Sequence, residues 1–196
     1  MLYLTDKFKN TTIILASKSP RRQFLLGELG LEFDVIDKAE VDESYPAGLT
    51  KKAIPVYLAV KKSEALKDRL HDDTLLITAD TIVWCKKKVL DKPDGRDDAI
   101  ELLQKLSGRK HQVITGVCLR TKSKRVTFYS RTLVRFRTLH KHEIIYYVDK
   151  YKPFDKAGAY GIQEWIGYIG VESIKGSYFN VMGLPVSKLY EKLISF

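Results

Sequence analysis

The segment Leu15–Arg22, which reads LASKSPRR, combines anion-binding groups at a point where a strand is expected to pass into a helix. A Ser-Pro pair is typical of a helix N-cap followed by the first helical position. Backbone N–H groups at a helix start attract anions, and hydroxyl and guanidinium groups add donors that suit phosphate oxygens. We therefore interpret Ser17, Arg21 and Arg22 as candidate phosphate-binding residues. A capped helix with solvated arginines is the alternative that this segment alone leaves open.

Asp80 stands just after Thr74–Thr78, an apolar run typical of a strand that is covered on both faces. In open α/β sheets, ligands bind at the carboxyl ends of the strands. A carboxylate at that edge can bind magnesium or accept a proton from an attacking water. Apolar residues lie on both sides of Asp80, and burying an unpaired carboxylate among them costs free energy. We therefore favour a functional role for Asp80 over one in which it only caps a turn.

Two further segments place polar groups in turn-like surroundings. Lys92 precedes a proline, which holds it extended, and an expected hairpin separates it from Asp80. The segment Asp155–Gln163 contains two glycines that would let the backbone approach a flat ligand, and Gln163 offers both a donor and an acceptor to a base edge. A common Lys-Pro turn and a tight turn between strands are the respective competing interpretations.

Several motif classes are absent from the sequence. Neither GxxxxGK[ST] nor GxGxxG occurs, and no serine lies in a nucleophile-elbow context. The two cysteines, Cys85 and Cys118, lie in apolar stretches without a CxxC pairing, so we expect buried free thiols. The residues His140–Glu143 are interpreted as the polar start of a helix rather than as metal ligands.

The composition favours a globular protein with an anionic partner. The chain has 196 residues, of which 44% are hydrophobic, and its formal charge is +10. Such an excess favours nucleic acid, an anionic membrane or a phosphorylated small molecule. No segment is apolar for long enough to span a bilayer, and the first ten residues lack the apolar core of a signal peptide. We therefore predict a cytoplasmic protein without a membrane partner.

Alternating strand and helix patterns predict the framework. Strands are expected at residues 12–16, 31–36, 74–84, 89–90, 112–120, 126–137 and 169–174. Helices are expected between Ser19 and Gly30 and at residues 50–70, 96–106, 140–150 and 186–194, the third of these capped by Asp94 or a neighbour. Alternating elements with a hairpin inside imply an α/β architecture with a mixed sheet.

Eight segments, in order and spacing, resemble the Maf family of nucleotide pyrophosphatases over residues 14–193, nearly the whole chain. They are LASKSPRR, VDE at 41–43, LAVKK at 58–62, ITADTIV at 77–83, DKP at 91–93, LSGRKHQVITGV at 106–117, PFDKAGAYGIQ at 153–163 and GSYFNVMGLP at 176–185.

The resemblance implies an α/β fold with a mixed twisted sheet flanked by helices, related to inosine triphosphatases. It implies a single domain over residues 1–196 with two lobes and a central cleft, often as a homodimer. It also implies a divalent cation, Mg²⁺ or Mn²⁺, and hydrolysis between the α- and β-phosphates of a nucleoside triphosphate substrate. The form KAGAYGIQ resembles the branch that acts on dTTP and UTP rather than on 7-methyl-GTP.

Carried over residue by residue, the resemblance makes Asp80 the proton acceptor. The resulting assignments are catalytic roles for Asp80, Lys62 and Lys92, metal binding for Glu43 and Asp80, and substrate binding for Ser17, Arg21, Arg22, Thr81 and Gln163. The pair Glu164-Trp165 departs from the small residue expected after the glutamine, which we expect to alter the base pocket.

Two other functions stay open at this point. One is a family member that acts on 7-methyl-GTP or another modified nucleotide. The other is a basic nucleic-acid-binding or cell-division regulatory protein, whose binding would depend steeply on salt. Aromatic residues do not alternate with the basic ones on a recognisable platform, so nucleic acid is the less favoured partner.

Overall fold

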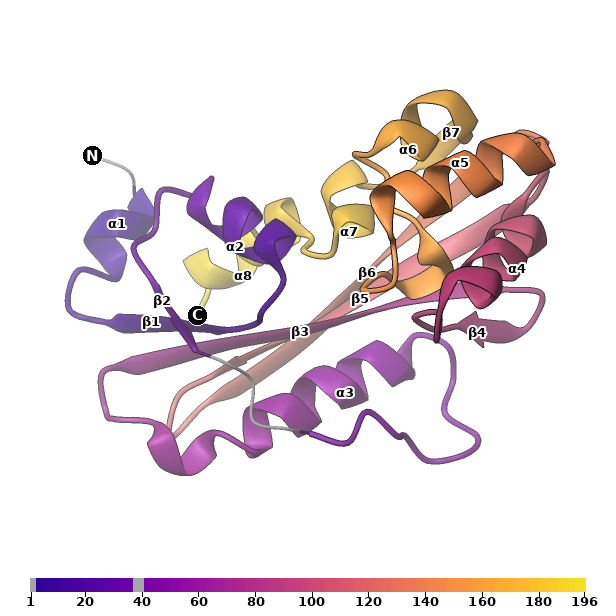
Figure 1. Ribbon diagram of the computed structural model, residues 1–196. Helices are drawn as coiled ribbons and strands as arrows, with labels where there is room; N and C mark the ends of the chain where they lie inside the picture. Colours follow the sequence, from indigo (N-terminus) through magenta and orange to yellow (C-terminus); the bar gives the residue numbers. More distant parts are fainter. Residues whose placement is uncertain (1–2, 37–40) are drawn as a thin grey trace. The chain divides into compact units, whose positions relative to one another are not determined.

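The computed structural model describes residues 3–36 and 41–196, so the first two residues of the N-terminal segment lie outside the described part of the chain (Figure 1). Contacts between residues divide the chain into two compact units. The first comprises Met1–Asp80, Thr115–Ser130 and Gly183–Phe196, and the second comprises Thr81–Ile114 and Arg131–Met182. The boundary after Asp80 falls inside a strand, so one continuous strand contributes to both units.

A mixed sheet is the framework of the fold, as predicted. Its strands follow the order β2-β1-β3-β5-β6-β7, and β4 pairs with β3 off this path. Strand β1 is parallel to β2 and β3, whereas β4 is antiparallel to β3 and β7 is antiparallel to β6. The strands are β1 Thr12–Ala16, β2 Asp34–Ile36, β3 Thr74–Cys85, β4 Lys88–Leu90, β5 Lys110–Arg120, β6 Arg125–Phe136 and β7 Val171–Lys175.

The helices of the first unit are α1 Tyr3–Lys7, α2 Pro20–Gly27, α3 Ala53–Glu64 and α8 Val186–Ile194. In Figure 1, α3 lies along one face of this unit's strands, and α2 and α8 lie on the other. The Thr78 hydroxyl donates to the Ala59 carbonyl at 2.7 Å, which joins β3 directly to α3. Helix α3 is shorter than the predicted span, and Pro55 lies in its first turn, where a missing N–H removes no helical bond.

The helices of the second unit are α4 Arg96–Leu106, α5 Lys141–Tyr151, α6 Trp165–Gly170 and α7 Tyr178–Met182. One apolar cluster joins α4 and α5 to the strands, and its largest fully buried members include Phe136, Tyr147 and Leu103. The short helices α1, α6 and α7 were not predicted, because five or six residues carry too little periodicity to reveal a helix.

Both helices with a predicted N-cap begin where the sequence placed that cap. Ser19 occupies the N-cap position of α2, but its side chain makes no capping hydrogen bond. The N-cap of α4 is Gly95, the neighbour of Asp94, and the Asp94 N–H donates to the Asp98 carboxylate at 3.1 Å. The residue types at the two helix starts therefore predicted the position of each start to within one residue, but not the hydrogen bonds that form there.

The structure confirms two predictions about residues that could have formed other sites. The His140 N–H donates to the Glu143 carboxylate at 2.8 Å at the start of α5, and a hydrogen bond from Arg137 lowers the pKa of Glu143 to about 2. Both cysteines are free and buried. Among residues 3–36 and 41–196, no helix has the length and apolar character needed to cross a bilayer.

His111 makes the stability of the second unit depend on pH. Its ring is buried, with Nε2 2.7 Å from the Tyr160 hydroxyl oxygen, and burial lowers its pKa to about 4. An unfolded histidine, with a pKa of about 6.5, binds the proton more readily, so stability is full above that value and is lost as the pH falls toward 4. We expect a loss of about 3 kcal/mol from this group between pH 7 and pH 4.

Urea unfolding at pH 7, 5.5 and 4.5 measures this dependence. His111→Gln should flatten the curve relative to the unmodified protein, whereas His142→Gln, at an exposed position, should leave its slope unchanged. Equal slopes in the unmodified protein and His111→Gln would show that His111 is not the titrating group.

Candidate active site

The turn between β1 and α2 is closed by hydrogen bonds among its own polar groups. The Ser17 hydroxyl oxygen accepts from the Ser19 N–H at 3.2 Å, and the Gln23 amide donates to the Ser17 carbonyl at 3.0 Å. Ser17 is buried, and Arg21 is half-buried. Because the Ser17 oxygen acts as an acceptor in the turn, its own O–H can donate to a ligand oxygen.

Arg22 ties this turn to the end of the first unit's part of β3. Its Nη1 donates to the Ala79 carbonyl and its Nε donates to the Gly183 carbonyl, each at 2.9 Å. Burial lowers the pKa of Arg22, and the nearby Asp80 carboxylate acts in the opposite direction. The backbone directly before Asp80 is therefore attached to the basic turn. Sequence reasoning could not identify the two carbonyls, because every residue has one.

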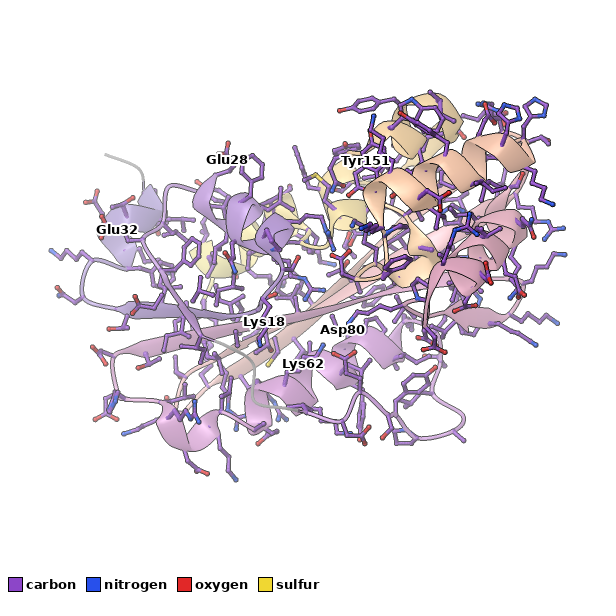
Figure 2. The ribbon with its side chains drawn as sticks, in the orientation of Figure 1. Lys18, Glu28, Glu32, Lys62, Asp80 and Tyr151 are labelled. Atoms are coloured by element: carbon purple, nitrogen blue, oxygen red, sulfur yellow. The ribbon has the colours of Figure 1, made fainter. Side chains whose placement is uncertain are left out.

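Asp80, Lys62 and Glu43 form a charged cluster in the same unit. The Lys62 ammonium, near the end of α3, makes an ion pair with Asp80 on β3 and lies 3.1 Å from the Glu43 carboxylate. Lys62 is 5% exposed and Asp80 is 8% exposed, whereas the Glu43 side chain is 36% exposed. Figure 2 shows Lys62 reaching from α3 toward Asp80. The cluster thus has one accessible side, formed by Glu43.

The first unit therefore brings together residues that lie far apart in the sequence. Lys62 is 18 positions from Asp80, and Arg22 is 57 positions from the carbonyl to which it donates. Two carboxylates, a buried ammonium and the Arg22 guanidinium lie around the end of this part of β3. Such a set can bind several phosphate oxygens and can place a carboxylate beside them.

The two carboxylates also fit a divalent cation that binds together with a phosphorylated ligand. Within residues 3–36 and 41–196, no group of three or more His, Cys, Asp or Glu could hold a metal ion. Glu43 and Asp80 contact the same Lys62 nitrogen, so their oxygens face a common point. Magnesium commonly uses one or two carboxylates plus substrate phosphates, which matches this pair better than a permanent metal cage does.

The remaining predicted site residues belong to the second unit. Thr81 is half-buried and follows Asp80 on β3, and Lys92 is exposed shortly after β4. Gln163 lies in a tight turn, because the Glu164 N–H donates to the Gly161 carbonyl at 3.0 Å. The side-chain oxygen of Gln163 is buried without a hydrogen-bond partner in the described structure. Such a group is costly unless a ligand or water satisfies it.

Gly158 lies where a side chain has no room. It has φ +68°, a conformation that favours glycine, and a Cβ there would lie 3.1 Å from the Val83 side chain. Its N–H donates to the Asp91 carbonyl at 3.0 Å, which anchors the segment beside the residues that lead to Lys92.

The pair Glu164-Trp165 faces helix α5. Glu164 accepts a hydrogen bond from Tyr147 and lies 3.2 Å from the Lys156 ammonium. The ring of Trp165 packs edge-on against Tyr146, with 4.8 Å between the ring centroids. The departure from a small residue at this position is thus accommodated by contacts with α5.

Comparisons with known proteins show which family the sequence resembles over nearly its whole length. A family model described as "Maf-like protein" matches residues 12–196. A protein of Parabacteroides distasonis named dTTP/UTP pyrophosphatase is 54% identical over 193 residues, which cover 98% of this chain and 100% of that protein. A protein of the same name from Bacteroides fragilis is 55% identical, with 98% of each chain covered.

A solved structure shares the fold. The HAM1 protein from Coxiella burnetii aligns with a TM-score of 0.50 and 14% identity over 95% of this chain and 100% of its own. The family model extends over nearly the whole chain, and relatives with more than half of their residues identical match along the same length. On these grounds the chain belongs to the Maf family.

Proposed function

We propose that this chain hydrolyses dTTP and UTP to the nucleoside monophosphate and pyrophosphate. The single observation that carries the proposal is the cluster in which Lys62 joins Asp80 and Glu43 while Arg22 attaches the basic turn to the residue before Asp80. The names of the relatives from Parabacteroides distasonis and Bacteroides fragilis support the choice of substrate.

The cluster supplies the groups that this hydrolysis requires. The oxygen of a water molecule attacks the α-phosphorus, the bond from that phosphorus to the bridging oxygen breaks, and pyrophosphate leaves. Asp80 accepts the proton that the water loses. Lys62, Ser17 and Arg21 neutralise or hydrogen-bond the phosphate oxygens, on which negative charge accumulates in the transition state.

Two residues of the second unit and Arg22 complete the proposed set. Lys92 contributes a further positive charge toward the phosphates. Thr81 contributes a hydroxyl to substrate choice, and Arg22 acts both through its carbonyl contacts and through its charge. These three roles rest on the family's motif positions.

The proposed cofactor is Mg²⁺ or Mn²⁺, held by Glu43 and Asp80. When bound, such a cation lowers the pKa of a coordinated water and neutralises phosphate charge, which a carboxylate base alone cannot do. Each carboxylate has a second oxygen besides the one that contacts Lys62, and these oxygens would hold the cation.

Gln163 is the proposed reader of the base. Thymine and uracil present an N3–H donor and an O4 acceptor, which match an amide oxygen and an amide N–H. The unsatisfied oxygen of Gln163 would accept from N3–H. Cytosine lacks that donor, and a mismatched buried polar group costs about 1–3 kcal/mol, so a fixed amide rejects it. One methyl group discriminates weakly, which explains acceptance of both dTTP and UTP.

A nucleotide panel tests the proposal. Pyrophosphate release is measured with dTTP, UTP, CTP, GTP and 7-methyl-GTP, each with magnesium, manganese or a chelator. We expect dTTP and UTP to be cleaved with kcat/KM about 5- to 100-fold above that of CTP, and we expect the chelator to abolish turnover. A preference for 7-methyl-GTP would replace the proposal by the purine-directed alternative. Full activity in the presence of the chelator would show that the reaction does not require the proposed cation.

A further inference from the structure

The turn that carries Gln163 is held at both of its ends by one buried hydroxyl group. The turn consists of Gly161, Ile162, Gln163 and Glu164, and the Glu164 N–H closes it by donating to the Gly161 carbonyl. The Tyr147 hydroxyl oxygen accepts from the Gly161 N–H at 3.0 Å, and its O–H donates to the Glu164 carboxylate. A single atom of α5 therefore bonds the first and the last residue of the turn.

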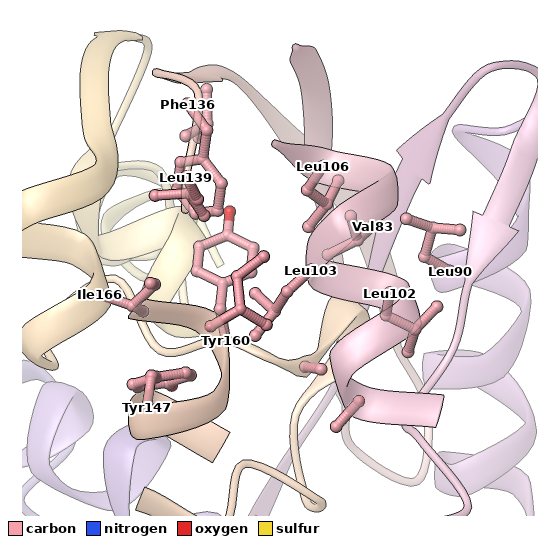
Figure 3. Packing of buried hydrophobic residues seen from close by; sticks show 14 of the residues in the cluster. Val83, Leu90, Leu102, Leu103, Leu106, Phe136, Leu139, Tyr147, Tyr160 and Ile166 are labelled. Atoms are coloured by element: carbon pink, nitrogen blue, oxygen red, sulfur yellow. The ribbon is translucent and has the colours of Figure 1, made fainter. Parts of the chain in front are cut away.

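The surroundings make this bridge rigid. Tyr147 is fully buried, and Figure 3 shows it in the same apolar cluster as Tyr160 and Ile166. Lys156 approaches the other oxygen of Glu164 at 3.2 Å, and the Lys156 side chain is only 10% exposed. Both oxygens of the Glu164 carboxylate thus have a partner, which fixes the rotation of that group.

The two glycines next to this bridge leave no space for adjustment. A Cβ at Gly161 would lie 2.7 Å from the Glu164 carboxylate carbon, and a Cβ at Gly167 would lie 1.9 Å from the Ile162 carbonyl oxygen. The backbone of the turn is therefore in contact with Glu164 on one side and with α6 on the other. Neither contact touches the Gln163 side chain.

Gln163 lies at the third position of this turn, and its side-chain oxygen is one of the buried polar atoms without a hydrogen-bond partner in the described structure. An amide distinguishes uracil from cytosine only if it cannot rotate. Rotation by 180° exchanges its donor and acceptor and makes it match the edge of cytosine instead. Selectivity at this residue thus requires that the amide keep one orientation toward the base, and the backbone of the turn sets the position from which the side chain is presented.

We infer that Tyr147, Glu164 and Lys156 form a clamp of positioning residues that sets base selectivity by immobilising the turn under Gln163. This inference rests on the proposed function, because the clamp is argued to affect recognition of the base of the proposed substrates, dTTP and UTP. The clamp touches neither the phosphates nor the water. Its loss therefore acts on the ratio between pyrimidine substrates and leaves proton transfer unchanged.

Tyr147→Phe tests the clamp because it removes the bridging hydroxyl and keeps the ring. We expect the ratio of kcat/KM for UTP over CTP to fall by about 10-fold. The fall should come from a higher KM for UTP and a lower KM for CTP, with kcat for UTP within about twofold of the unmodified enzyme. Tyr151→Phe is the matched control, because Tyr151 lies on the same helix with its ring stacked at 5.1 Å on Tyr147.

Each outcome of this experiment decides the inference. A merely structural role would lower thermal stability and reduce turnover of both nucleotides without changing their ratio, and that result would overturn the clamp. If Tyr147→Phe does not fold, Glu164→Gln decides in the same way, because it removes the charge that holds Lys156. An unmodified protein that cleaves neither dTTP nor UTP would instead contradict the proposed function. If the unmodified protein prefers UTP over CTP and Tyr147→Phe keeps the same ratio of kcat/KM, the result would contradict the clamp and leave the proposed function intact.

Discussion

Asp80→Asn is expected to lower kcat for UTP by roughly 100- to 10,000-fold while leaving the protein folded. The substitution keeps the shape of the side chain and removes the carboxylate that would accept the proton of the attacking water. Its amide oxygen can still accept a hydrogen bond from Lys62, whose ammonium also contacts Glu43. Steady-state pyrophosphate release with saturating UTP and magnesium measures the effect, and the thermal midpoint checks the fold.

Asp149→Asn provides the control for this change. Asp149 lies on α5 and pairs with Arg96 at 2.6 Å, so the substitution removes one aspartate charge from an ion pair in the second unit. We expect kcat to stay within about twofold of the unmodified value, since this half-exposed ion pair contributes little to stability and lies in the second unit. Near-normal turnover by Asp80→Asn would exclude Asp80 as the proton acceptor.

Gly116→Ala should strongly destabilise the first unit. A Cβ at Gly116 on β5 would lie 2.4 Å from the backbone of Pro55 and Val56 at the start of α3. Backbone atoms cannot rotate away as a side chain can, so α3 and β5 must separate. We expect unfolding to become easier by about 3 kcal/mol, as measured by urea denaturation at pH 7.

The same substitution should reach the catalytic cluster through the helix. Lys62 lies near the other end of α3, so displacement of that helix moves the ammonium relative to Asp80. A shift of about 1 Å in a positioned group can cost roughly 100-fold in rate, and we expect kcat of the folded Gly116→Ala protein to fall at least about 10-fold.

Gly27→Ala is the matched control for Gly116→Ala, because it also adds one methyl group to a glycine of the first unit. Its Cβ would meet only the Phe33 ring, at 4.0 Å, and Gly27 is the last residue of helix α2. An alanine in a helix is favoured over glycine, so stability should stay the same or rise by up to about 1 kcal/mol. Equal stability of the Gly116 and Gly27 variants would show that α3 and β5 have room for a methyl group between them.

The sequence alone determined the framework and the order of the chemical motifs. The patterns that predicted strands at 74–84, 112–120 and 126–137 and a helix at 186–194 are local, and β3, β5, β6 and α8 lie where those patterns predicted. Local patterns suffice there because a covered strand or a helix face repeats over many residues. The short helices α6 and α7 lack that repetition, and only packing against the rest of the second unit stabilises them.

Only the tertiary structure decided which polar groups meet. The ammonium of Lys62 lies between Glu43 and Asp80, and Arg22 donates to a carbonyl 161 positions away. Tyr147 bonds both ends of the turn that carries Gln163, although nothing in the periodicity of α5 distinguishes this tyrosine from Tyr146 or Tyr151. Sequence spacing measures distance along the chain, whereas hydrogen bonds and ion pairs depend on distance in space, which the packing of α3 and α5 against the sheet sets.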